Sequence, residues 1–151
     1  MPNDSEIQPS PEQIEKDNEK LLAGFEQWLT DAGLSDATIG RHVDNISFFL
    51  EHFLQYYETV DARAGANHVP EFLGDWFIRK AMWSSEASIK GNAASLKKFY
   101  AFLAERGEVD RQVVQHLKQT IKAGMPIWLD NMREYVNYPG LKAGACESKL
   151  G

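Results

Sequence analysis

Three lysines between residues 85 and 107 have the spacing that a phosphate-binding surface needs. Lys90, Lys97 and Lys98 are separated by intervals that a helix places on neighbouring strips of one face. Ala94 and Ala101 share the strip and are small enough to permit close approach. Lysine ammonium groups neutralise phosphates and release counterions without reading a base sequence. The pattern therefore predicts a surface that can contact phosphates, and the alternative for the same lysines is an ordinary solvated face.

A few other side chains could add to this surface. Asn92 follows Lys90 closely and carries an amide that can read a base edge. An earlier amphipathic helix repeats the pattern, but Asp44 and Glu51 occupy its equivalent strip and would repel phosphate. The candidate contacts on that earlier helix are Thr38, Arg41 and His42.

No residue pattern in the chain predicts catalysis, a metal ion or a cofactor. There is no glycine-rich phosphate loop, no paired cysteine and no His-x-x-x-His spacing. The acidic residues are scattered and do not converge at helical spacing with other polar groups. We therefore expect a protein that is not an enzyme and that has no small-molecule substrate.

The total charge opposes polyanion binding, whereas its distribution permits it. The 151 residues carry a formal net charge of −6, which argues against nonspecific binding by the whole chain. The stretch 25–78 has two bases against nine acids, and the stretch 79–122 has nine bases against four acids. A basic face is thus expected in the second half of the chain.

The composition predicts one folded, cytoplasmic domain. Hydrophobic residues make up 43% of the chain, which is enough for a core, and no apolar run approaches the length of a membrane span. The N-terminus lacks the apolar region of a signal peptide. The single cysteine, Cys146, excludes an intrachain disulfide and favours a reducing compartment.

Apolar periodicity predicts an all-α fold, because no segment shows the alternation of a strand. The expected helices span about 14–32, 35–57, 71–81, 85–107 and 110–124, with a short amphipathic piece at 127–136. Ser35 and Ser85 are expected to cap helices. Gly124 and Pro126 are expected to end the fifth helix. The stretch 61–70, which contains glycine, asparagine and proline, is expected to be a loop.

An internal repeat relates two of these helices at an offset of fifty residues. Ser-Asp-Ala-Thr-Ile at 35–39 returns as Ser-Glu-Ala-Ser-Ile at 85–89, and the apolar positions that follow stay in register. An aromatic-rich helix precedes each copy. The sequence therefore predicts a four-helix core of two packed helical hairpins, followed by one or two C-terminal helices.

Two segments in this order resemble the core-binding (SAM-like) N-terminal domain of tyrosine recombinases and phage integrases. FEQWLTDAGLSDATIGRHVDNISFFLEHF, at 25–53, is similar to the first hairpin of that domain, with its Gly-Leu-Ser-x-x-Thr turn. IKGNAASLKKFYAFLAERG, at 89–107, is similar to its fourth helix, which ends in Phe-Tyr-x-Phe-Leu and glycine. The resemblance covers about 22–109.

The resemblance implies a DNA-binding module without catalytic activity. In the family, this helical domain lies across the duplex while a separate catalytic domain closes from the other side. That catalytic domain needs an arginine, a His-x-x-Arg pair and a nucleophilic tyrosine, and no histidine of this chain has arginine at the third following position. The implied partners are double-stranded DNA and either a second copy of the chain or a separate recombinase.

The chain departs from the family pattern in two places. The family has a basic pair after the isoleucine of its fourth helix, where this chain has Lys90-Gly91-Asn92. The family continues after the terminal glycine into its catalytic domain, whereas further helical sequence follows Gly107 here. The expected organisation is a disordered leader, a core-binding-like helical domain, a C-terminal helical extension packed on it and a flexible tail, at 1–12, 13–109, 110–137 and 138–151.

A second interpretation of the same sequence is an acidic helical module for protein interaction or dimerisation that has lost DNA binding. Its final amphipathic piece would offer an apolar edge to a partner or to a second copy. The residues of that edge are Ile127, Trp128, Met132 and Tyr135. This interpretation accounts for the acidic total and for the additional C-terminal helices.

Overall fold

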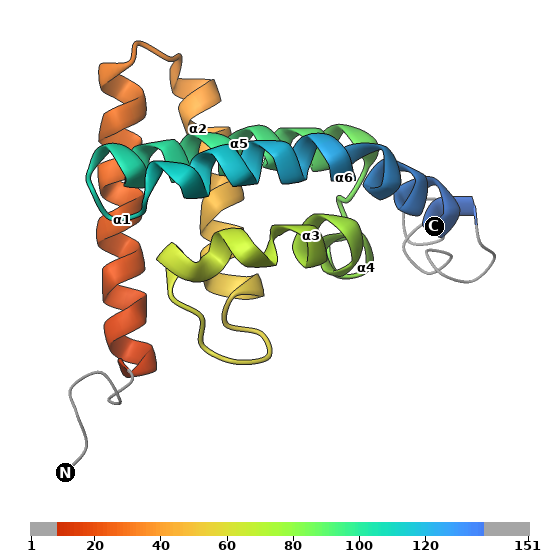
Figure 1. The fold of residues 1–151 in the computed structure, drawn as a ribbon, viewed down its shortest axis with the longest axis horizontal. Helices are drawn as coiled ribbons and strands as arrows, with labels where there is room; N and C mark the ends of the chain where they lie inside the picture. Colours follow the sequence, from red (N-terminus) through yellow and green to blue (C-terminus); the bar gives the residue numbers. More distant parts are fainter. Residues whose placement is uncertain (1–8, 138–151) are drawn as a thin grey trace. The chain divides into compact units, whose positions relative to one another are not determined.

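The computed structural model describes residues 9–137, and this part of the chain is all-α, as predicted (Figure 1). The chain divides into two compact units, Met1–Ala62 and Arg63–Gly151, and each is described by itself. Residues 1–8 of the predicted leader lie outside the described residues. The same holds for the whole predicted tail at 138–151, with Cys146.

The first unit begins with a long helix, α1 (Pro11–Asp31), that starts earlier than predicted. Ser10 and Gln13 form a capping box, in which the Ser10 side chain accepts from the Gln13 backbone N–H and the Gln13 side chain accepts from the Ser10 backbone N–H. Pro11 fits the first helical position because a residue there has no intrahelical partner for its N–H. The helix therefore begins inside the stretch 1–12 that was predicted to be a leader.

A tight turn joins α1 to α2 (Asp36–Phe48), and the two helices pack along each other. Gly33 has a φ of +83°, and the backbone N–H groups of Gly33 and Leu34 donate to Thr30 and Leu29. This is a Schellman turn, which uses glycine because other residues are strained at positive φ. Ser35 then caps α2 through the backbone N–H of Thr38, as predicted.

Each unit contains one short π-helical turn with the same apolar pattern. In the first unit, η2 (Phe49–Phe53) continues α2, and Leu54 donates its N–H to Phe49 five residues back. In the second unit, η4 (Phe72–Trp76) lies between the short helices α3 (Val69–Glu71) and α4 (Phe77–Lys80). The wider turn brings four apolar side chains of each segment into the interior: Phe49, Leu50, Phe53 and Leu54, then Phe72, Leu73, Trp76 and Phe77.

A 3-10 helix, η3 (Ala62–His68), begins at the last residue of the first unit and continues into the second, where the sequence predicted a loop. Glycine and proline marked 61–70 as irregular, but Ala62 and Val69 are buried and anchor the segment at both ends. Arg63 also forms an ion pair with Glu108, which follows the turn after α5. These tertiary contacts order a stretch that has little local preference for structure.

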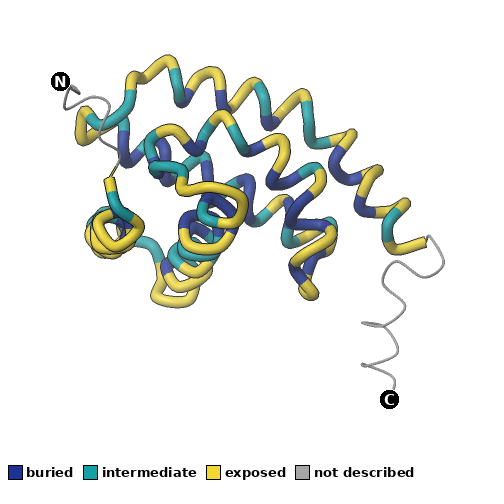
Figure 2. Tube along the Cα trace, turned by 90° about the horizontal axis from the view of Figure 1, so that it is seen from below, coloured by how far each residue is buried: buried dark blue, intermediate teal, exposed yellow. Residues whose placement is uncertain are grey.

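The rest of the second unit consists mainly of two long helices, α5 (Glu86–Glu105) and α6 (Arg111–Asn137), which lie side by side (Figure 1). Ser85 caps α5 through Ser88, and Gly107, with a φ of +74°, ends it in a second Schellman turn. Asp110 then caps α6 by accepting from the backbone N–H of Gln112. Figure 2 shows how buried and exposed positions recur along the described helices.

The prediction that a helix ends at Gly124 and Pro126 is wrong, because α6 runs through both residues without a break. An interior proline costs a helix about 3 kcal/mol. Burial of Trp128, Leu129 and Met132 just beyond it offsets that cost, since each such side chain contributes about 1.5–3 kcal/mol. The predicted fifth helix and the short piece at 127–136 are therefore one element.

Trp128 also explains two helical glycines. A Cβ on Gly124 would lie 2.3 Å from the Trp128 ring, and a Cβ on Gly74 of η4 would lie 2.7 Å from it. The indole thus occupies space that any larger residue at either position would fill. Asn131 reinforces the same contact by donating from Nδ2 to the Gly74 carbonyl oxygen at 3.0 Å. Together these contacts attach α6 to η4.

The burial pattern confirms the register of the internal repeat and corrects its second hairpin. Ile39, Ile46 and Phe49 are buried, as are their counterparts Ile89, Leu96 and Phe99. However, the helical segment at 69–80 packs mainly against α6, and less against α5. The C-terminal helix is therefore an integral part of the second unit.

Candidate nucleic-acid interface

The buried face of α5 determines where its lysines lie. The helix buries a broad stripe that includes Ile89, Ala93 and Tyr100. Lys90 is exposed, and Lys97 and Lys98 are half-buried. None of the three is buried, so each side chain reaches solvent from α5.

Lys97 and Lys98 nevertheless face different surroundings. Consecutive residues point about 100° apart around a helix, so side chains at i and i+1 do not share a face. Lys97 lines a groove beside α6, and Lys98 is not among the residues of that groove. The three lysines therefore form a spread of charge around α5 and not one narrow strip.

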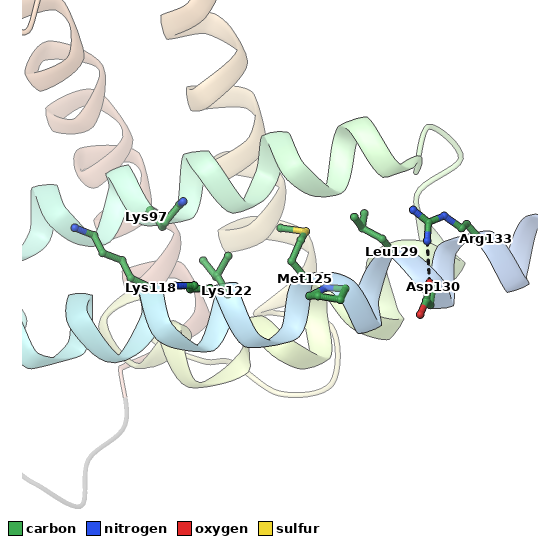
Figure 3. Close-up of a pocket in the computed structure, with 9 residues that line it drawn as sticks. Lys97, Lys118, Lys122, Met125, Leu129, Asp130 and Arg133 are labelled. Atoms are coloured by element: carbon green, nitrogen blue, oxygen red, sulfur yellow. Dashed lines mark hydrogen bonds and ion pairs between the residues drawn. The ribbon is translucent and has the colours of Figure 1, made fainter.

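The groove follows α6 from Lys118 to Arg133 and borders α5 at Lys97 (Figure 3). Its volume is about 780 Å³, and it is open to solvent. Met125 and Pro126 supply the accessible apolar surface along it, over the buried Ile121 and Leu129. Lys118 and Lys122 project at the same end of the groove as Lys97, and Arg133 is joined to Asp130 at the other end.

The two ends of the groove differ in available charge. Arg133 donates from Nε and Nη2 to both carboxylate oxygens of Glu86, at 3.1 and 2.8 Å, and from Nη1 to Asp130 at 2.8 Å. The hydrogen bonds and charge of Glu86, followed by those of Asp130, raise the pKa of Arg133 above its ordinary value. Arg133 therefore stays charged, but its charge is balanced.

Most arginines of the second unit form ion pairs, whereas the lysines of α5 and α6 form none among the described residues. Arg63 and Arg106 share Glu108, and Arg79 pairs with Asp75. Within residues 9–137, no ion pair involves six other bases of α5 and α6. These six, called the free cations below, are Lys90, Lys97, Lys98, Arg111, Lys118 and Lys122.

Asn92 does not belong to this surface, so the prediction that it reads a base edge fails in this structure. Its side chain is only 3% exposed, and Nδ2 donates to the Ser88 carbonyl oxygen at 2.8 Å. The wide buried stripe of α5 includes Asn92 together with Ser95, Phe99 and Phe102. A buried, locally bonded amide has no access to a nucleic acid.

The candidate residues of α2 lie in the first unit and make local contacts. Arg41 is exposed and donates to the Thr38 hydroxyl at 3.2 Å, and that hydroxyl also accepts from Ser35. His42 is half-buried. Asp36 and Asp44 are exposed on the same helix, so α2 offers a mixed charge to any ligand.

Sequence reasoning missed Lys118 and Lys122 as site residues. Both were counted in the basic stretch 79–122, and their i, i+4 spacing puts them on one face of a helix. Their proximity to Lys97 depends on α6 lying along α5. Local periodicity carries no information about that pairing.

Two of the four residues of the apolar edge expected for a protein-interaction module are buried. Trp128 is 5% exposed and Met132 is 1% exposed, whereas Ile127 is 61% exposed. Tyr135 is half-buried. The prediction that these four residues form one exposed edge is therefore wrong, because Trp128 and Met132 pack inside the second unit.

The described residues contain no group of three or more histidine, cysteine or acidic side chains placed to hold a metal ion. Over the same part of the chain, none of the helices combines the length and the apolar character of a membrane span. Comparison with family models, with curated proteins and with solved structures finds no match to the chain.

Proposed function

We propose that this chain is a non-catalytic DNA-binding module that contacts the duplex backbone through α5 and α6. The proposal keeps the function implied by the resemblance to the core-binding domain of tyrosine recombinases. It changes the expected second contact element from α2 to α6, since α6 supplies Lys118 and Lys122 next to Lys97.

The observation that supports the proposal is the set of free cations. Over α5 and α6 there are seven bases against four acids, and six of those bases lack an ion pair among the described residues. A cation that already pairs with a carboxylate must break that pair to bind phosphate. The free cations bind without this cost, and each phosphate contact releases counterions.

The acidity of the first unit limits the affinity but does not prevent binding. At physiological salt the Debye length is about 8 Å, so exposed charges farther away than this are largely screened. Only acidic side chains within about this distance of the bound phosphates would oppose a duplex held at α5 and α6 strongly. Binding should be weak, salt-sensitive and without strong sequence preference, because lysine–phosphate contacts do not distinguish bases.

A salt titration with a labelled duplex tests the proposal directly. If about four of the free cations contact phosphate, the logarithm of the binding constant should fall with the logarithm of salt concentration with a slope of roughly −3 to −4. The Lys90→Glu, Lys97→Glu double variant should weaken binding at least about tenfold and reduce the slope by roughly 2.

The first unit provides a matched control. Lys16 and Lys20 of α1 are exposed, and the Lys16→Glu, Lys20→Glu variant makes the same change in net charge. This control should keep its affinity within about threefold, since neither lysine belongs to the free cations of α5 and α6. A salt-independent response, or equal losses in the two double variants, would refute the proposal.

A further inference from the structure

DNA binding does not account for the apolar surface of the groove beside α6. Ile121, Met125 and Leu129 line the space between the lysines and Arg133. A duplex backbone offers phosphate and sugar, which need cations and polar groups. An apolar surface next to unpaired cations is instead complementary to a ligand that is both apolar and acidic.

The geometry matches a helical ligand in length. The groove extends over fifteen residues of α6, from Lys118 to Arg133, which corresponds to roughly 22 Å at 1.5 Å per residue. A bound helix of about four turns would cover it. Peptide helices bind such grooves through apolar side chains at i, i+3, i+4 and i+7.

The side chains of the groove suit this form of recognition. Met125 is half-buried and flexible, so it can adapt to the ridges of another helix. Lys97, Lys118 and Lys122 can pack their aliphatic stems against a ligand while their ammonium groups meet its carboxylates. Among the described residues, none of these lysines has an ion pair to break.

We infer that this groove docks an acidic amphipathic helix of a partner protein. The acidic side chains of that helix meet Lys97, Lys118 and Lys122, and its apolar stripe lies on Met125 and Pro126. The other end of the groove offers no free positive charge, because Arg133 is balanced by Glu86 and Asp130. The partner's acidic residues therefore gather over one half of its helix. The inference goes beyond DNA binding and does not depend on it.

The test uses the full chain and a defined peptide. The probe is a fluorescein-labelled peptide of about sixteen residues, with leucines on one helical stripe and glutamates beside them in one half. A second peptide replaces each glutamate by glutamine. Fluorescence anisotropy should show that the glutamate peptide binds at least about tenfold more tightly, since three exposed ion pairs contribute together.

Variants of the groove locate the binding. Lys118→Gln with Lys122→Gln should weaken binding of the glutamate peptide about fivefold, and Met125→Asp should weaken it about tenfold. The matched control is Lys90→Gln with Lys98→Gln, which removes the same charge from α5 outside the groove. This control should stay within about twofold. Circular dichroism melting identifies any variant that has lost its fold, and the lysine variants change only side chains that lie at the surface or are half-buried.

Three outcomes would overturn the inference. The glutamate peptide could fail to bind, the two peptides could bind equally, or the control pair could weaken binding as much as the groove pair. Duplex binding is measured separately on the same samples. If the unaltered chain binds the glutamate peptide and no duplex, only the proposed function is refuted, and if it binds the duplex and no peptide, only the docking groove is refuted.

Discussion

Replacement of Gly124 by alanine should destabilise the second unit, although alanine is the better helix former. In the interior of a helix, glycine to alanine normally gains about 1 kcal/mol. At this position the new Cβ would lie 2.3 Å from Cζ2 and 2.4 Å from Cε2 of Trp128. Carbon atoms pack best at about 3.5–4.0 Å, so the indole would have to move by more than about 1 Å.

The surroundings of the indole prevent an easy shift. Trp128 is 5% exposed, and it also lies so close to Gly74 that a Cβ there would be 2.9 Å from Nε1. Displacement from one glycine therefore spoils the contact with the other. Overpacking of this kind costs about 1–3 kcal/mol and occasionally more, and partial loss of a buried tryptophan adds to it. After the gain in helix propensity, we expect a net loss of about 1–3 kcal/mol.

Gly91 provides the same substitution without the steric overlap. It lies inside α5, and a Cβ there would meet nothing within 4 Å. Gly91→Ala should therefore stabilise the protein by about 0.5–1 kcal/mol. Thermal unfolding followed by circular dichroism should show opposite shifts, of about 2–4 °C per kcal/mol for a chain of this size.

A double-variant cycle isolates the cause. In a Trp128→Leu background, Gly124→Ala should lose most of its penalty, because the overlapping ring atoms are gone. If Gly124→Ala raised the melting temperature as Gly91→Ala does, the indole would not occupy the space between the two glycines, and the account of how α6 attaches to η4 would be refuted.

Three other outcomes are expected. Ser85→Ala should lower the free energy of unfolding by about 1 kcal/mol, because Ser85 Oγ accepts from the Ser88 backbone N–H at 3.0 Å. Chemical denaturation measures this loss, and an unchanged free energy would show that the cap is dispensable. Pro126→Ala should stabilise α6 by about 1–2 kcal/mol, because alanine restores a backbone hydrogen-bond donor inside the helix. The gain is limited because the unfolded chain becomes more flexible, and a loss of stability would contradict this account. The glutamate peptide at saturation should weaken duplex binding at least about threefold, because both ligands need Lys97, and independent binding would place the duplex elsewhere on the protein.

Sequence patterns predicted the local elements well. Ser35 and Ser85 cap the helices that they were expected to cap, and the apolar stripes after them are buried in the predicted register. These features depend on neighbours within a few residues, so periodicity and residue type are sufficient. The same reasoning correctly gave the all-α class.

The errors occurred where distant residues decide the structure. Gly124 and Pro126 have helix-ending chemistry, but Trp128 packs against Gly74 and keeps α6 continuous. Within the interval 61–70, Ala62–His68 form a 3-10 helix held partly by an ion pair from Arg63 to Glu108. The meeting of Lys97 with Lys118 and Lys122 likewise requires two helices to pair, which no local pattern reveals. The candidate site could therefore be predicted only in its α5 half.

The integration of α6 into the second unit determines how this chain can be shortened. A fragment that stops after residue 109, where the predicted core-binding-like domain ends, lacks α6, which packs along α5. It also leaves the space beside Gly74 empty, because Trp128 is absent. Such a truncation should expose apolar surface and aggregate, so the shortest fragment expected to fold as this unit must extend at least to Met132, which is 1% exposed.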